Sequence, residues 1–273
     1  MTTNDKINTA MKISQILVES AADRGATKFI SDNHLIKCMV QDGEIIANAN
    51  VTLSVDGHVE VPFALCHGVF SAEGNVTSLK NFPRMFSFNS YLICMDQELK
   101  DLTGGPAKFT GNYYNVRNNK ISSWKGAPDK LPNGGMNISN NLLTDFVGAP
   151  KEFGKELRIS GNKFTSLKDI HKHIHRINSS IWIGGNPIKS NILGLLLIEG
   201  LTSVAIDDSW VKGRYNTPLL KKDEVKYHNS QDLIDAVAII NKYVGPKNNK
   251  GKISVLEAQN ELIEAGLEDF AEP

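Results

Sequence analysis

The sequence lacks an excess of charge of either sign, because 30 lysine and arginine residues balance 30 aspartate and glutamate residues in a chain of 273. Proteins that bind nucleic acid or anionic membranes in bulk carry a basic excess, so we expect neither partner.

Cysteine is scarce, and Cys38, Cys66 and Cys94 are too scattered for a disulfide framework or a structural zinc site. We expect no cofactor and no bound metal.

Long apolar stretches are also missing. The longest, Ile192 to Ile198, is far shorter than the ~18 residues that a membrane span needs. The polar start of the chain has no hydrophobic region of the kind found in signal peptides. The sequence has no glycine-rich phosphate loop and no nucleophile elbow. These absences predict a cytoplasmic protein that is not an enzyme.

The sequence does contain one short motif, called the repeat phrase below, that recurs between about residues 73 and 186. Its copies begin at an asparagine: NKISSW at Asn119, NLLTDF at Asn141, NKFTSL at Asn162 and the weaker NPI at Asn186. The intervals are 22, 21 and 24 residues, and Gln97 and Gly74 occupy the asparagine position of two copies upstream. Self-similarity at a fixed period of this length is typical of a solenoid.

Each copy has the pattern of one coil, with apolar residues five and three positions before the asparagine that suit a short strand facing inward. These residues are Leu92 and Cys94, Tyr114 and Val116, Met136 and Ile138, Leu157 and Ile159, Ile181 and Ile183. A buried asparagine amide after the strand can bond to backbone groups that the turn leaves unpaired. Pro83, Pro106, Pro128 and Pro150 recur at a matching period and predict a return side of turns and loops, because proline cannot donate to a sheet.

The outward residues of the same strands are the candidate binding site. They are Ile93 and Met95, Asn115 and Arg117, Asn137 and Ser139, Arg158 and Ser160, Trp182 and Gly184. Large apolar residues near arginine are the composition of an interaction surface, since tryptophan and arginine are enriched among energetic hot spots. We predict a partner-binding site of Ile93, Met95, Arg117, Arg158 and Trp182. The alternative is that flanking elements cover Ile93 and Trp182 and leave a plain polar strip.

The N-terminal segment, residues 1–68, is predicted to be an α+β cap. Residues 5–24 have the apolar spacing of an amphipathic helix that stops at Gly25. Two hairpins are predicted over 35–47 and 51–61, around the pairs Asp42-Gly43 and Asp56-Gly57. Such a unit would cover the open edge of a solenoid spanning 69–207. A substrate-binding domain is the alternative interpretation of the segment.

The C-terminal part, residues 208–273, is predicted to be a loop followed by a helical hairpin. A short apolar helix over 188–199 and a last strand over 201–206 precede it. The loop holds Trp210, Arg214 and Tyr215, which we predict as a secondary partner-binding site. Ser230 is placed to cap the first helix of the hairpin. The hairpin either caps the solenoid or detaches to bind a partner.

The repeat phrase, an asparagine, an aliphatic residue, threonine or serine, a hydrophobic residue and then Gly-Ala-Pro, resembles the divergent leucine-rich repeats of large tailed bacteriophages. The resemblance covers about residues 51–207, and the run from Glu257 to Phe270 is similar to the end of some of those proteins. It implies an α+β protein, a short leucine-rich-repeat-like solenoid of about five to six repeats of 21–24 residues. It also implies a scaffold in the host cytoplasm that binds a host protein, including a defence component, or a phage protein.

Two clusters remain as candidates for chemistry. His171, His173 and His175 alternate, so a strand would place them on one face for a transition metal, whereas a helix would pair only His171 with His175. Asp207 and Asp208 are adjacent, and adjacent strand residues point to opposite faces. We therefore favour a non-enzymatic interaction module. A virion structural or assembly protein, with an unknown oligomeric state, and a metal-dependent hydrolase are the alternatives.

Overall fold

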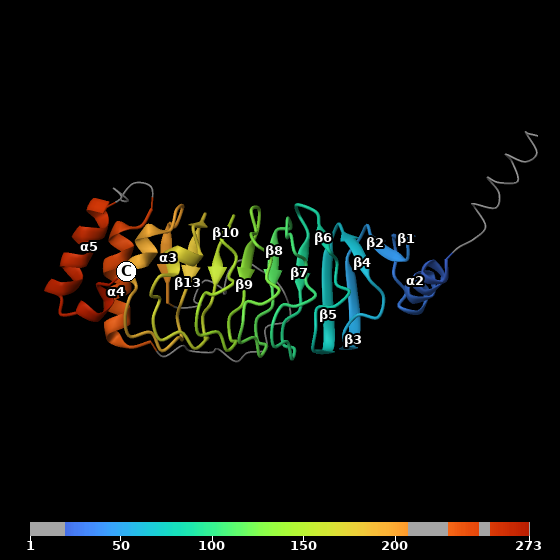
Figure 1. Ribbon diagram of the computed structural model, residues 1–273, viewed down its shortest axis with the longest axis horizontal. Coiled ribbons are helices and arrows are strands. Elements are labelled where there is room, and N and C mark those ends of the chain that lie inside the picture. Colours follow the sequence, from blue (N-terminus) through green and yellow to red (C-terminus); the bar gives the residue numbers. More distant parts are fainter. Residues whose placement is uncertain (1–19, 207–228, 246–251, 273) are drawn as a thin grey trace, which may run out of the picture.

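The computed structural model describes residues 20–206, 229–245 and 252–272. One parallel sheet of eight strands, in the order β14-β13-β11-β9-β8-β7-β5-β3, runs along the molecule. Figure 1 shows these strands side by side along the long axis, with α2 at one end and α4 and α5 at the other. The predicted solenoid is therefore confirmed. In the described ranges, no helix has both the length and the apolar character to cross a bilayer.

The long sheet supplies one side of every coil. Its strands are β3 (Val51–Gly57), β5 (Val69–Val76), β7 (Tyr91–Ile93), β8 (Tyr113–Asn115), β9 (Gly135–Asn137), β11 (Leu157–Arg158), β13 (Ser180–Trp182) and β14 (Ser203–Ala205). The helices of the described ranges are α2 (Ala21–Asp32), α3 (Ile170–His173), α4 (Gln231–Tyr243) and α5 (Lys252–Glu264), with 3₁₀ helices η1 (Leu193–Leu197) and η3 (Glu268–Phe270).

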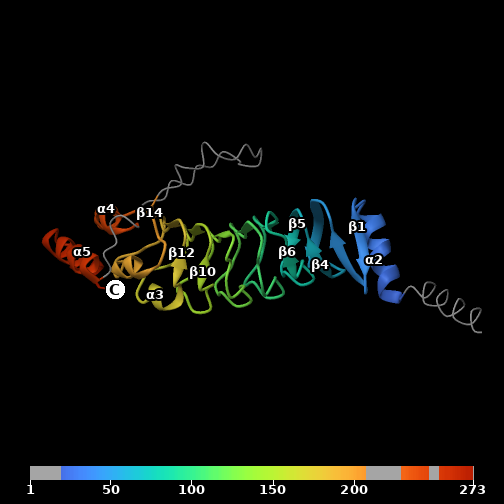
Figure 2. The same ribbon diagram turned by 90° about the horizontal axis from the view of Figure 1, so that it is seen from above.

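The return side contains more strand than the proline pattern predicted. A sheet of order β1-β2-β4-β6 comprises β1 (Cys38–Gln41), β2 (Glu44–Ala47), β4 (Phe63–Cys66) and β6 (Met85–Phe86), and β10 (Glu152–Phe153) pairs with β12 (Arg176–Ile177). Seen from above, β4, β6, β10 and β12 lie on the side of the solenoid away from β5 and β14 (Figure 2). These strands are short because a proline interrupts the return segment of most coils.

The register of the long sheet stacks equivalent residues of successive coils. Met136 pairs with Leu157, and the amide of Ile138 donates to the carbonyl of Arg158 at 2.9 Å, so Ile138 and Ile159 occupy matching places. All ten residues that the sequence predicted to face inward have no exposed surface. Each coil thus buries its apolar face only against its neighbours, which is why the array is stable as a stack.

The four predicted asparagines are buried, and each bridges two coils. Asn141 Nδ2 donates to Ile138 O of its own coil at 3.0 Å and to Val116 O of the preceding coil at 3.1 Å. Its Oδ1 accepts from the amide of Ile121 at 2.9 Å. Asn119, Asn162 and Asn186 make the equivalent bonds. The amide side chains therefore complete the backbone hydrogen bonding of each corner, as the sequence predicted.

The upstream copies follow the same frame. Gln97 Oε1 accepts from the amide of Val76 at 3.0 Å, the bond that asparagine makes in later coils. A second, outer row of side chains was not predicted: Asn118 Nδ2 donates to Asp96 Oδ1 at 2.6 Å, and Asn140 Nδ2 donates to Asn118 Oδ1 at 2.8 Å. Asp96, Asn118 and Asn140 have φ of 60°, 55° and 54°. After glycine, asparagine and aspartate are the residues that best tolerate this left-handed conformation.

A column of β-turns forms the corner opposite the asparagines. In one coil the amide of Ala127 donates to the carbonyl of Trp124 at 2.8 Å, and Gly126 has a φ of 82°. A turn of this shape requires a positive φ at its third residue, which glycine adopts without strain. The same turn recurs over Leu79–Phe82, Leu102–Gly105, Phe146–Ala149 and Leu167–Ile170. The Gly-Ala-Pro motif therefore marks this corner.

The N-terminal end differs from the prediction in two elements. The hairpin of β1 and β2 forms, but the hairpin predicted over 51–61 is wrong: β3 pairs in parallel with β5, so the long sheet already begins within the predicted cap. The alternating apolar residues of β3 are buried by the next coil rather than by their own sequence neighbours. The helix stop at Gly25 is also wrong, because α2 starts at a capping box of Ser20 and Asp23 and continues to Asp32. The rest of the helix predicted over 5–24, residues 5–19, lies outside the described residues.

The C-terminal end of the long sheet is closed by side-chain amides. Asn241 of α4 donates to Val204 O at 2.9 Å and accepts from Val204 N at 2.8 Å, so it occupies the place of a further strand. Asn229 makes the same kind of bridge between Ile206 and Gly185. Ser230 caps α4 as predicted, and α5 packs on α4. Satisfying the edge in this way removes an exposed pairing surface.

Candidate functional site

The outer strand face carries most of the predicted site. By this name we mean the last residue of β7, β8, β9, β11 and β13 and the residue two positions after each of these strands. Ile93 pairs with Asn115 across β7 and β8, and the bond from Asp96 N to Arg117 O places Met95 beside Arg117. Ile93, Met95 and Arg117 are all half-buried. The structure therefore brings three of the five predicted partner-binding residues together: Ile93 ends β7, and Met95 and Arg117 lie two residues after the ends of β7 and β8.

Arg158 and Trp182 form a separate pair further along the same face. The Arg158 guanidinium lies over the Trp182 ring, 4.7 Å from its centroid, and Trp182 Nε1 donates to Ser180 Oγ at 3.0 Å. Trp182 points outward, yet only 6% of its surface is exposed. For Trp182 the structure therefore agrees with the alternative of a covered residue, since a cation–π contact with the neighbouring strand helps to cover it.

The two arginines on this face carry unpaired donors. The Nε atoms of Arg117 and Arg158 are buried and have no hydrogen-bond partner. Arg158 approaches Glu156 only at 3.5 Å through its terminal nitrogen. A buried donor without an acceptor costs about 1–3 kcal/mol, so a carboxylate or carbonyl of a bound molecule would lower the free energy of the complex if the arginine side chain turned to bring its Nε to the surface.

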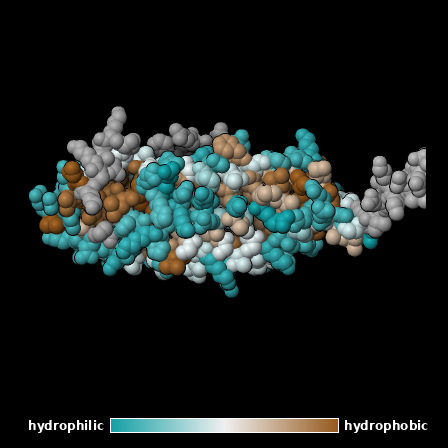
Figure 3. Space-filling view, turned by 45° about the horizontal axis from the view of Figure 1, so that its top comes forward, coloured by the Kyte–Doolittle hydropathy of each residue, from teal (hydrophilic) through white to brown (hydrophobic). Residues whose placement is uncertain are grey.

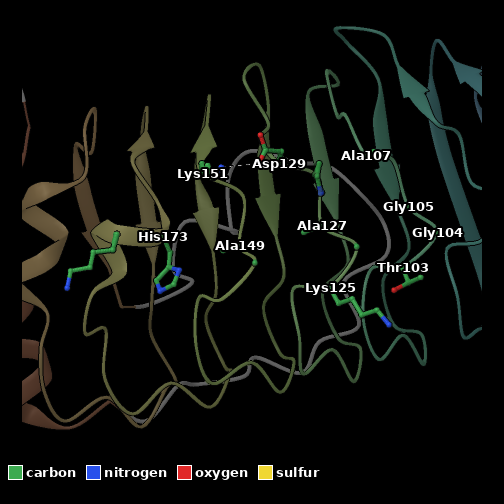
Figure 4. A pocket seen from close by; sticks show the side chains of 14 residues that line it. Thr103, Gly104, Gly105, Ala107, Lys125, Ala127, Asp129, Ala149, Lys151 and His173 are labelled. Atoms are coloured by element: carbon green, nitrogen blue, oxygen red, sulfur yellow. Dashed lines mark ion pairs between the residues drawn. The ribbon is translucent and has the colours of Figure 1, made fainter.

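A groove on the turn side is a second candidate, and sequence reasoning missed it. It has a volume of about 660 Å³ and crosses four coils, with glycine and alanine of the stacked turns as its floor. Figure 4 shows Lys125, Lys151 and His173 around it, and an ion pair joins Lys151 to Asp129 at 3.5 Å. The repeated Gly-Ala-Pro motif was the signal: small residues at one corner of successive coils leave a channel.

The electrostatics of this groove are nearly balanced. Asp129 neutralises Lys151, and Asp169 neutralises Lys172 at 2.8 Å. The hydrogen bond from Lys172 lowers the pKa of the Asp169 carboxyl below its usual value. Among the described residues lining the groove there is no phenylalanine, tyrosine or tryptophan, and His173 supplies one ring, so the groove lacks the row of stacking side chains that single-stranded nucleic acids use. The groove therefore combines the backbone of the turns with three lysines, two of which are paired with a carboxylate.

The histidine run does not gather into one cluster. His171 and His173 belong to α3, His173 lines the groove, and His175 is exposed. Burial lowers the pKa of His171, whose Nδ1 has no hydrogen-bond partner. Within the described ranges, no three histidine, cysteine, aspartate or glutamate residues lie close enough together to hold a metal ion. The short helix therefore separates the side chains that a strand would have aligned.

Several predicted residues lie outside the part of the chain that the structure describes. These are Trp210, Arg214 and Tyr215 of the secondary site and the pair Asp207-Asp208. The three cysteines are all described and free. Comparison of the chain with protein-family models, with curated proteins and with solved structures finds no match.

Proposed function

We propose that the protein is a non-enzymatic interaction module that binds another protein through the outer strand face of its solenoid. The observation that carries the proposal is the half-exposed group of Ile93, Met95 and Arg117 at the ends of β7 and β8. Two apolar side chains beside an arginine with a buried, unpaired Nε combine the contact types that dominate binding energy at protein interfaces. Arg158, with a second unpaired Nε, extends the site toward β11.

Within each coil, one set of residues stacks the coils and another set faces outward, and this separation supports the proposal. The inward residues and the four asparagines are fully used by stacking, as their burial and hydrogen bonds show. The outward residues differ from coil to coil, for example Ile93, Asn115 and Arg158, so no single residue type is required there. A rigid scaffold with a variable outer column is the arrangement by which solenoids bind extended partners.

We further propose that these coils are divergent leucine-rich repeats of a bacteriophage protein. The recurring asparagine phrase and the short parallel strands support this proposal. On this proposal the partner is a host protein, including a defence component, or another phage protein, and binding takes place in the host cytoplasm. The unpaired arginine donors favour a partner that presents carboxylates or backbone carbonyls at its surface.

Affinity capture from bacterial lysate followed by mass spectrometry tests the proposed face. The double variant Ile93→Asp/Arg117→Glu should lose the captured protein, because each hot-spot residue contributes at least about 2 kcal/mol, or roughly a 30-fold change in Kd. Binding of the purified partner by calorimetry then gives the change in Kd. A thermal melt equal to that of the wild type would show that the variant is folded.

The matched control places the same charge changes on the turn side. Lys80 and Val147 are the second residues of two stacked turns and are exposed, so Val147→Asp/Lys80→Glu should capture the partner as the wild type does. Equal capture by the outer-face variant and the wild type would rule out this face as the binding site.

A further inference from the structure

Helix α5 presents an apolar stripe to solvent at the C-terminal end of the molecule. Ile253, Leu256 and Ile263 are 58%, 58% and 46% exposed, and Asn260 lies exposed between them. Their spacing of three, four and three residues is that of the a and d positions of a coiled-coil heptad. The opposite side of the helix is already used, because Ala258 and Leu262 are fully buried. The exposed stripe is therefore a second apolar face of α5 that is not part of the core.

We propose that this seam, defined as Ile253, Leu256, Asn260 and Ile263, pairs with the same seam of a second copy as a short parallel two-helix coiled coil. Isoleucine and asparagine occupy the a positions, and leucine and isoleucine occupy the d positions. An asparagine at one a position is the feature that fixes register and the two-stranded state in such pairs, because the two amides bond across the twofold axis. A second copy supplies the matching asparagine by symmetry.

The acidic residues beside the seam select the parallel orientation. Glu257 and Glu264 both occupy e positions and are exposed. An antiparallel pair would place Glu257 of one copy against Glu264 of the other, and like charges repel. In a parallel pair, Glu264 lies beside Gln259 of the other copy, which carries no charge. The charge pattern of the helix therefore opposes one of the two possible arrangements.

The position of α5 permits this contact. The helix is the outermost element at its end of the solenoid and crosses the long axis of the molecule (Figure 1). Figure 3 shows apolar surface gathered at this end. A twofold axis parallel to the helix directs the two solenoids away from each other, so their coils do not collide. The pair would be an end-to-end dimer that leaves the outer strand face of both copies accessible.

The size of the seam sets the strength of the pairing. Three large apolar side chains per copy provide less than the roughly 800 Å² per partner of a standard stable interface. The helix is already held by the fold, however, so pairing requires no folding of α5 and avoids much of the ordering cost. We therefore expect a reversible dimer whose population increases with protein concentration.

Cysteine cross-linking of the full-length chain tests both pairing and orientation. In a parallel pair, residue 260 of one copy faces residue 260 of the other, so Asn260→Cys alone should form a disulfide-linked dimer under mild oxidation. An antiparallel pair places residue 260 against residue 256. Cross-linking only in a mixture of Asn260→Cys and Leu256→Cys would therefore overturn the parallel assignment. The wild type gives the background from Cys38, Cys66 and Cys94.

Sedimentation velocity up to millimolar concentration provides the independent measurement. The wild type should shift from monomer to dimer, and Leu256→Glu should raise the dimer Kd at least about tenfold, as removal of a buried core residue does. Val147→Glu, at an exposed valine on the turn side, should dimerise as the wild type does. A wild type that remains monomeric throughout, or an α5 that captures a different protein instead, would overturn the proposal. Neither result bears on the outer strand face.

Discussion

Gly126→Ala is expected to lower the free energy of unfolding by about 4 kcal/mol. Gly126 has a φ of 82°, where an alanine costs roughly 1–2 kcal/mol. A Cβ there would also lie 2.5 Å from the carbonyl oxygen of Leu102, against the backbone of the preceding coil. Backbone atoms cannot move aside as a flexible side chain does, so the coils must separate at this corner, and overpacking of this kind adds about 1–3 kcal/mol. Urea denaturation measures the loss.

Gly148→Ala is the matched control because it lies in the same Gly-Ala-Pro motif one coil later. Its φ is 84°, but the nearest atom to an added Cβ is Trp124 Cβ at 3.5 Å, an ordinary contact. We expect a loss of only about 1–2 kcal/mol from the backbone conformation. Equal losses for the two variants would contradict the close approach of the turns at Gly126.

Asn162→Ala is expected to lower the free energy of unfolding by about 3 kcal/mol. Asn162 Oδ1 accepts from the amide of Leu143 at 3.0 Å, and its Nδ2 donates to the carbonyls of Ile138 and Ile159 at 3.0 and 2.9 Å. Alanine replaces none of these bonds and leaves the Leu143 amide buried without an acceptor. An orphaned buried group costs about 1–3 kcal/mol, and the lost donors to the two carbonyls add to it. Urea denaturation measures this loss as well.

Asn118→Gly is the control for the asparagine ladder. Asn118 belongs to the outer row, is half-buried, and has a φ of 55°. Glycine occupies the equivalent position in later coils, at Gly161 and Gly185, with φ of 66° and 71°. We expect a change within about 0.5 kcal/mol, as for most surface substitutions. A loss as large as that of Asn162→Ala would show that the outer row, and not the buried one, holds the corner together.

The two rows explain how the protein combines a rigid frame with a variable surface. The buried asparagines repeat in four successive coils because they bond to backbone atoms, which are the same in every coil. Among the outward residues, Asn115 and Asn137 accept from the amides of Arg117 and Ser139, whereas Arg158 contacts the Trp182 ring, so the outward positions share no single bonding requirement. A binding face that differs from coil to coil follows from this separation, and the proposed interaction with a partner protein depends on it.

The sequence determined the coil and its register. The asparagine period, together with apolar residues five and three positions earlier, predicted ten inward residues, and all of them are buried. This prediction succeeds because every coil has the same local requirements. Each needs one apolar strand, one corner with a side-chain amide, and one turn with glycine. The first hairpin and the cap of α4 by Ser230 are likewise local, and both are confirmed.

Only the tertiary structure decided which outward residues remain accessible and where the sheet begins. Trp182 and Ile93 occupy the same position in their coils, but Arg158 covers Trp182 while Ile93 stays half-exposed. β3 has the alternation of a hairpin strand, yet it pairs with β5 in parallel. Alternation shows that one face is buried but not against what. The partner of a strand, the cover of a side chain and the groove between turns all depend on residues about twenty positions away, which a local pattern does not specify.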